Sequence, residues 1–104
     1  MDVYNGTKLI KSRPMNFGLA VEAAKMGKKV GRSGWNGSGM FAYLMGGYPN
    51  GVPANQETAQ KLGFEVGDTV KICPYWAIKT AQGDVATWAP SCSDSLADDW
   101  MILE

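Results

Sequence analysis

One stretch of the sequence has the spacing of an amphipathic helix, and the other segments are short and bounded by turn-forming residues. The apolar positions of this stretch are Phe17, Ala20, Val21 and Ala24. Because they fall at i, i+3, i+4 and i+7, they lie on one face of a helix. Asn16 is suited to cap the helix N-terminus, since its side-chain oxygen accepts from free backbone amides. Gly27 is expected to end the helix, because glycine adopts the left-handed conformation at low cost.

The remaining regular segments are predicted to be short strands. They are rich in β-branched, aromatic or long apolar residues, and turn residues separate them. The predicted strands are 7–12, 29–32, 40–45, 69–80, 85–89 and 100–103. Pro74 cannot donate a ladder hydrogen bond, so it marks an edge position, a bulge or a break. A hairpin turn is expected at 81–84.

The middle of the chain is the least regular part. Glycine, proline and asparagine dominate 46–51, which predicts a loop. Residues 54–62 are expected to form a short helix that Gly63 closes. We treat 46–69 as an insertion within a single domain that spans 1–104. The fold class predicted is α+β, with a mostly antiparallel sheet packed against one main helix.

The size and charge of the chain limit its partners. A chain of 104 residues buries only roughly 60–70% of its unfolded surface, so we expect self-association to add stability. Ten Lys and Arg balance ten Asp and Glu, whereas binding to a nucleic-acid polymer usually needs a basic excess. We therefore expect no nucleic-acid partner. The densest basic cluster leaves room for a local pocket that takes one small anion; its members are Lys25, Lys28, Lys29 and Arg32.

Catalysis finds little support in the sequence. The chain has no histidine, which removes Ser–His and Cys–His pairs, the usual metal sites and the commonest general base. Asp98 and Asp99 are adjacent, so they diverge on a helical turn and do not form an acid–base pair. The glycines match neither the dinucleotide nor the Walker phosphate loop. We expect no enzyme activity, no metal and no cofactor.

The sequence also indicates the compartment. Cys73 and Cys92 lack both CxxC spacing and a secreted framework, so we expect two buried or half-buried free thiols in a reducing environment. The N-terminus has no signal-peptide pattern. No apolar run approaches the roughly 20 residues that a membrane helix needs. A soluble intracellular protein is expected.

Residues 33–41, with the sequence Ser-Gly-Trp-Asn-Gly-Ser-Gly-Met-Phe, form the most informative motif. Trp35 stands in a glycine-rich turn whose backbone a ligand can approach closely, and its ring offers a flat face for stacking. Asn36 adds an amide that both donates and accepts. A tight hairpin whose tryptophan folds back onto the sheet explains the same residues equally well.

Residues 85–94 form a second motif. Trp88 precedes a loop with hydroxyls, exposed amides and a carboxylate, which are groups that suit a ribose and a phosphate. The alternative is that Ser91, Ser93 or Asp94 caps a helical turn at 95–98, and capping is the better interpretation for at least one of them. A base stacked on either tryptophan of the two motifs would gain about 1–3 kcal/mol.

Taken together, these motifs resemble a family of small phage proteins, Thoeris anti-defense 2. The resemblance covers 15–45 and 73–103 in the order of the family. It is carried by the runs 15–18, 27–30, 32–41, 74–83 and 88–100. Residues 1–14 precede the usual start of the family and form an N-terminal extension, and 46–69 follows no family pattern that we can assign.

The resemblance implies a sponge for a small signalling molecule. Members bind glycocyclic ADP-ribose, the signal made by the Toll/interleukin-receptor-type enzyme of the Thoeris system, without cleaving it. In the cytoplasm of the infected bacterium this keeps the downstream effector silent. Some members also hold cyclic dinucleotides at a separate site, which would block a second defence system, CBASS. The resemblance further implies a homotetramer with pockets shared between protomers, and no membrane partner.

By motif position, the resemblance assigns ligand contacts to both motifs. The ligand-binding residues that we derive in this way are Trp35, Asn36, Trp88, Ser91 and Asp94, to which we add Phe41 and Arg32. On chemical grounds the tryptophans would face the adenine or ribose of the ligand. Asn36 and Asp94 would contact the polar edges of the ligand, and Ser91 would contact its phosphate. Arg32 would be a charge partner.

Two other classes of function fit the same residues. One is a phage accessory module whose tryptophan-rich face binds another protein and no nucleotide. The other is a weak nucleotide hydrolase. A ligand-dependent melting temperature separates a nucleotide binder from the first, and recovery of intact ligand separates it from the second.

Overall fold

A computed structural model of the chain describes residues 2–3, 10–11, 13–35 and 39–103. The chain groups into two compact units, one made of 1–44 with 76–104 and the other of 45–75. The described residues form three helices and nine strands, and all the pairings with a determined register are antiparallel. The predicted α+β class is confirmed.

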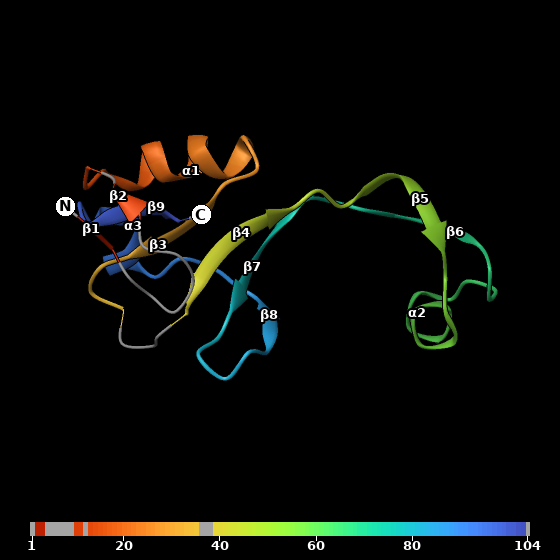
Figure 1. The fold of residues 1–104 in the computed structure, drawn as a ribbon. Coiled ribbons are helices and arrows are strands. Elements are labelled where there is room, and N and C mark those ends of the chain that lie inside the picture. The colour runs from red at the N-terminus through yellow and green to blue at the C-terminus, as the bar shows by residue number, and fades with distance from the viewer. Residues whose placement is uncertain (1, 4–9, 12, 36–38, 104) are drawn as a thin grey trace. The chain divides into compact units, whose positions relative to one another are not determined.

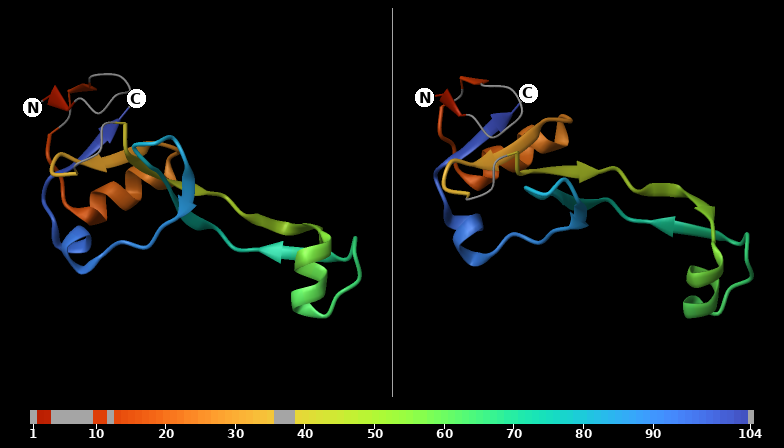
Figure 2. Two further views of the ribbon diagram at one scale, coloured as in Figure 1. Left: turned by 90° about the horizontal axis from the view of Figure 1, so that it is seen from below. Right: turned by 60° about the horizontal axis from the view of Figure 1, so that its bottom comes forward.

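A five-stranded sheet is the framework of the first unit (Figure 1). Its strands, in the order β8-β7-β4-β3-β9, are β8 (Val85–Thr87), β7 (Tyr75–Lys79), β4 (Phe41–Met45), β3 (Lys29–Arg32) and β9 (Trp100–Leu103). Strand β9 pairs with β3 along its whole length, so that Arg32 lies opposite Trp100. Figure 2 shows β8 folded back beside β7 through the hairpin predicted at 81–84. A separate pair joins β1 (Asp2–Val3) to β2 (Ile10–Lys11).

The main helix, α1 (Phe17–Lys25), forms where the apolar stripe predicts it. The side chain of Asn16 accepts a hydrogen bond of 2.9 Å from the amide of Leu19. Gly27 follows the helix with a φ of 88°, as expected of its end. The residues that α1 buries are Ala20, Ala23 and Ala24. Because these side chains are small, the helix approaches β3 and β9 closely (Figure 1).

Trp100 is the centre of the core in the first unit. Its side chain has no exposed surface, and it packs with Ala20, Val30 and Ala42. Four further aromatic residues surround or adjoin it, and with Trp100 we call them the aromatic cluster: Phe17, Trp35, Trp76, Trp88 and Trp100. The backbone of Trp100 exchanges two hydrogen bonds with Met15, of 2.9 and 3.0 Å, which ties the last strand to the start of the helix.

The second unit contains β5 (Tyr48–Pro53), α2 (Gln56–Leu62) and β6 (Thr69–Ile72). Strands β5 and β6 pair with an irregular register, and α2 lies between them in the chain (Figure 2). The predicted short helix is confirmed, with Gly63 in the left-handed conformation at its end, although it begins at 56 because Asn55 caps it. The loop predicted at 46–51 is wrong in part, since 48–51 belong to β5. That 46–69 is an insertion in one domain stays a prediction.

Three other expectations differ from the structure. The strand predicted over 69–80 is divided into β6 and β7, which belong to different sheets, so that of the three alternatives for Pro74 the break is correct. The helical turn predicted at 95–98 is instead α3 (Cys92–Leu96), because Ser91 is its N-cap. Cys73 and Cys92 are free thiols, but both are exposed and not buried. Of the strand predicted at 7–12, residues 7–9 and 12 lie outside the described part.

Gly47 should tolerate a side chain less well than Gly63. Both have positive φ, so alanine is strained by about 1–2 kcal/mol at either position. A Cβ at Gly47 would also meet the backbone of Ile72 and lie 2.7 Å from the carbonyl carbon of Cys73, whereas nothing lies within 4 Å at Gly63. We expect Gly47→Ala to lower the free energy of unfolding by about 2–4 kcal/mol, and Gly63→Ala by about 1–2. Urea titration measures both, and equal losses would contradict the close approach.

Candidate functional site

Two of the predicted ligand contacts, Trp35 and Trp88, belong to the aromatic cluster. Their ring centroids are 6.0 Å apart with planes at 78°. Trp35 also meets Trp100 at 5.4 Å, and Trp88 meets Trp76 at 5.3 Å, again edge to face. Edge-to-face contacts of this kind are favourable and hold the rings in place. Trp35 therefore folds back onto the core, as the hairpin alternative predicts, while both rings stay half-buried and keep some exposed surface.

Arg32, a third predicted contact, joins two carboxylates. Its Nε donates to Asp99 at 2.8 Å, and its Nη1 donates to Asp94 at 2.9 Å. The second oxygen of Asp99 accepts from the amide of Gly34 at 3.0 Å and from the hydroxyl of Ser33 at 3.3 Å. The guanidinium thus links β3 to α3 and to the turn before β9. Its charge is matched within the chain.

The ion pairs change the acidity of both carboxyl groups. Burial by itself raises the pKa of Asp94 and of Asp99. Hydrogen bonds outweigh this effect: Ser91 and Arg32 donate to Asp94, and Arg32 and Gly34 donate to Asp99, so both pKa values lie below the usual 3.8. The hydrogen bonds from Arg32 to Asp99 and Asp94 raise the pKa of the guanidinium above its ordinary value. All three groups are charged at neutral pH.

Ser91 and Asp94 form a capping box at the start of α3. The hydroxyl of Ser91 accepts from the amide of Asp94 at 3.0 Å, and the carboxylate of Asp94 accepts from the amide of Ser91 at 3.0 Å. The carbonyl of Asp94 also accepts from the indole N–H of Trp100 at 2.8 Å. The capping alternative is therefore correct for both residues. Asn36 of the first motif lies outside the described residues.

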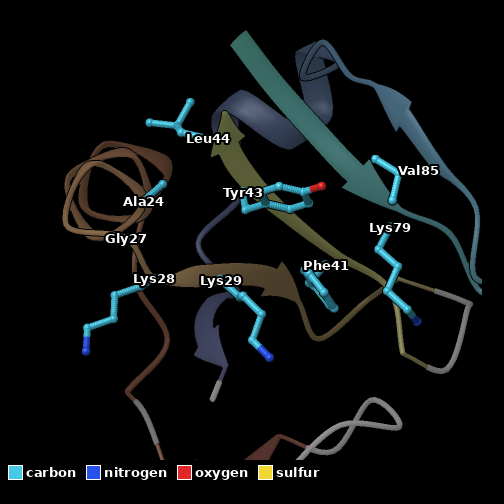
Figure 3. A pocket seen from close by; sticks show the side chains of 9 residues that line it. All are labelled: Ala24, Gly27, Lys28, Lys29, Phe41, Tyr43, Leu44, Lys79 and Val85. Atoms are coloured by element: carbon cyan, nitrogen blue, oxygen red, sulfur yellow. The ribbon is translucent and has the colours of Figure 1, made fainter. Parts of the chain in front are cut away.

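A pocket lies elsewhere on the first unit, over the sheet (Figure 3). Its volume is about 270 Å³. Three lysines and two aromatic residues line it, together with four small or aliphatic residues: Lys28, Lys29, Lys79, Phe41 and Tyr43, with Ala24, Gly27, Leu44 and Val85. We call this the Phe41 pocket. Of the predicted ligand contacts that the structure describes, Phe41 alone lines it.

Two ammonium groups lie close to the Phe41 ring. The Nζ of Lys29 is 4.9 Å from the ring centroid, and the Nζ of Lys79 is 5.7 Å from it. Lys79 also donates to the carbonyl of Gly39 at 3.1 Å. Lys28 is exposed. Among the residues that the structure describes, no acidic side chain lines the pocket. Apolar side chains beside lysine ammonium groups are suited to an anion that carries an aromatic or sugar ring.

The sequence predicted only part of this pocket. The basic cluster of the sequence includes Lys28 and Lys29, and it indicated a local anion pocket. Lys79 gave no signal, because it is 38 residues from Phe41 in the chain and meets it only through the neighbouring strands β4 and β7. Apart from Phe41, the described residues to which the two motifs pointed lie in the aromatic cluster or in a helix cap.

Comparison with known proteins gives the family. The Thoeris anti-defense 2-like domain matches residues 15–103. A protein of Bacillus phage SP01 named Thoeris anti-defense 2 is 37% identical over 92 residues, which are 86% of this chain and 94% of the relative. This chain belongs to the Thoeris anti-defense 2-like family. The resemblance seen in the motifs is thus confirmed, and membership of the Thoeris anti-defense 2-like family supports a role in phage anti-defense.

Two further findings concern metals and membranes. In 13–35 and 39–103, no three side chains of histidine, cysteine, aspartate or glutamate gather as a metal site would require. No helix in the described part of the chain is long and apolar enough to cross a membrane.

The ion pairs of Arg32 should make stability sensitive to acid. Because the folded pKa of Asp99 lies below 3.8, its contribution is present above that pH and is lost as the pH falls through the folded pKa. We expect Asp99→Asn to lower the free energy of unfolding by about 1.5–3 kcal/mol at pH 7. The deficit relative to the wild type should shrink below pH 3.8.

The matched control is Asp98→Asn, because Asp98 is the exposed neighbour of Asp99. Its cost should stay within about 0.5 kcal/mol at every pH. Urea titrations from pH 3 to pH 7 measure both variants. A deficit of Asp99→Asn that does not change with pH would contradict the account.

Proposed function

We propose that this chain binds a cyclic ADP-ribose-type signal, glycocyclic ADP-ribose, and sequesters it without cleaving it. In the cytoplasm of an infected bacterium this would inhibit the Thoeris defence. The observation that carries the proposal is the Phe41 pocket, where an aromatic ring lies beside two lysine ammonium groups and the described lining contains no acidic side chain.

The chemistry of the pocket matches the parts of such a ligand. A cyclic ADP-ribose contains an aromatic base, ribose rings and two linked phosphates. Phe41 and Tyr43 offer apolar faces to rings, and the lysines offer donors to phosphate oxygens. The volume of about 270 Å³ lies just below the roughly 300–1,000 Å³ of ordinary ligand pockets. One protomer would therefore hold part of the ligand, and a neighbouring protomer would complete the site.

The predicted contacts outside the Phe41 pocket remain part of the proposal. Trp35 and Trp88 are half-buried, so each ring keeps surface that a base or ribose could meet. Arg32, Ser91 and Asp94 already bond within the chain, and they would contact a ligand only through their remaining donor or acceptor positions. Asn36 is proposed on the resemblance alone.

Sequestration requires affinity and no bond cleavage. The chain contains no histidine. The carboxylates that the fold brings together, Asp94 and Asp99, are held ionised by Arg32 and lie outside the pocket lining. These features favour a binder over a hydrolase.

We also propose that the chain is a homotetramer. Several large apolar side chains are more than half exposed in the single chain: Leu19, Met26, Leu62, Val66, Val85 and Leu96. Burial of such side chains between protomers would add stability to a small domain. Light scattering coupled to size exclusion should give four times the 11.2 kDa mass of one chain. A mass of 11.2 kDa at micromolar concentration would contradict the tetramer.

The test of the function is calorimetric titration with glycocyclic ADP-ribose. We expect saturable binding and a raised melting temperature, since ligand at 100 times its Kd adds about 2.7 kcal/mol to stability. Heating the complex and chromatography should recover the intact ligand. Recovery of a cleaved product would identify a hydrolase.

The same titration with cyclic dinucleotides tests the second ligand class that the resemblance implies. The absence of any binding or melting shift with both ligand classes would reject the proposal. It would favour the alternative of an accessory module that binds another protein.

A further inference from the structure

We infer that Lys29 and Lys79 clamp the linked phosphates of the ligand across the Phe41 ring, while Lys28 attracts the anion without a direct contact in the complex. The inference rests on the proposed function and names the chemical group that this chain recognises, a diphosphate. It assigns distinct roles to three lysines of one pocket.

The clamp is built on three neighbouring strands. Lys29 stands on β3, Phe41 on β4 and Lys79 on β7, which are adjacent in the sheet. Neighbouring strands are about 4.8 Å apart, so the strands that carry the two lysines are about 10 Å apart with β4 between them. Figure 3 shows their ammonium groups on either side of the ring, at 4.9 and 5.7 Å from its centroid. In the proposed clamp, both ammonium groups reach an anion that lies beside the ring and between them.

The two ammonium groups retain donors for a ligand. Lys79 has three N–H donors and uses one on the carbonyl of Gly39, which fixes its position and leaves two. Lys29 contacts the ring and, within the described residues, forms no ion pair with a carboxylate. A group with several phosphate oxygens and two negative charges would satisfy these donors and neutralise both cations. Charge-assisted hydrogen bonds of this kind are roughly twice as strong as neutral ones.

Lys28 is placed differently. Its side chain is exposed and extends away from Phe41 in Figure 3. A solvated charge at the rim of a pocket raises the association rate through its field and adds little to the lifetime of the complex. The three lysines should therefore differ in the kinetic constant that each controls.

The test is to measure the Kd, the association rate and the dissociation rate for glycocyclic ADP-ribose in lysine-to-methionine variants, which keep the apolar stem. We expect Lys29→Met and Lys79→Met each to weaken binding roughly 10- to 100-fold through faster dissociation. Lys28→Met should change the Kd less than about threefold. The change should come from slower association, and added salt should reduce this difference in association rate. Because both clamp residues would hold one diphosphate, the double variant should lose less than the product of the single losses.

The matched control is Lys25→Met. Lys25 lies on α1 outside the pocket lining, is exposed and pairs with Glu22 at 3.6 Å, so the Kd should not change. Lys79→Arg keeps the charge and the bond to Gly39, and it should recover most of the affinity. Melting temperatures of the free variants verify that each one folds.

The possible outcomes separate the clamp from the proposed function. If the wild type binds and both clamp variants bind within about twofold of it, the phosphates are held elsewhere and the clamp is rejected, while sequestration stands. If Lys28→Met and Lys29→Met have equal effects on dissociation, the division of roles is rejected. If the wild type binds no nucleotide, both the clamp and the proposed function are rejected.

Discussion

The structure depends on the burial of one indole ring, that of Trp100. Its backbone is bonded to Met15 at the start of α1, its ring N–H is bonded to the carbonyl of Asp94 in α3, and its strand pairs with β3. Burial of a tryptophan side chain removes about 150–250 Å² from water, which stabilises the fold by about 4–6 kcal/mol. In a chain with few large buried side chains, this single residue connects both ends of the first unit. The other rings of the aromatic cluster pack around it or against one another.

This arrangement explains why the residues that look most functional in the sequence are also structural. Trp35 and Trp88 pack edge to face in the cluster, and Arg32 forms ion pairs with both Asp94 and Asp99. Their geometry is fixed before any ligand arrives. The Phe41 pocket differs, because none of its described lining residues is a carboxylate that could pair with its lysines. Packing and ion pairing thus hold one part of the unit, and another part presents lysine ammonium groups beside an aromatic ring.

Local signals in the sequence predicted the elements that local interactions determine. The cap at Asn16, the apolar stripe of α1 and the left-handed glycine after α2 all appear as expected. The division at Pro74 could not be fixed, because proline permits a bulge, an edge or a break, and the choice depends on which strand pairs with which. The contact between Lys79 and Phe41 could not be predicted for the same reason, since it arises from strand pairing between distant segments. The motif around Ser91 was ambiguous because hydroxyls and carboxylates that bind ligands also cap helices.

The most direct test of the account is a crystal structure of the protein with glycocyclic ADP-ribose bound. The account predicts that the ligand lies over the Phe41 ring, with phosphate oxygens within hydrogen-bond distance of the ammonium groups of Lys29 and Lys79 and with the ligand intact. A ligand that lies against Trp35 or Trp88, with its phosphates far from both lysines, would contradict the assignment of the Phe41 pocket as the site of sequestration.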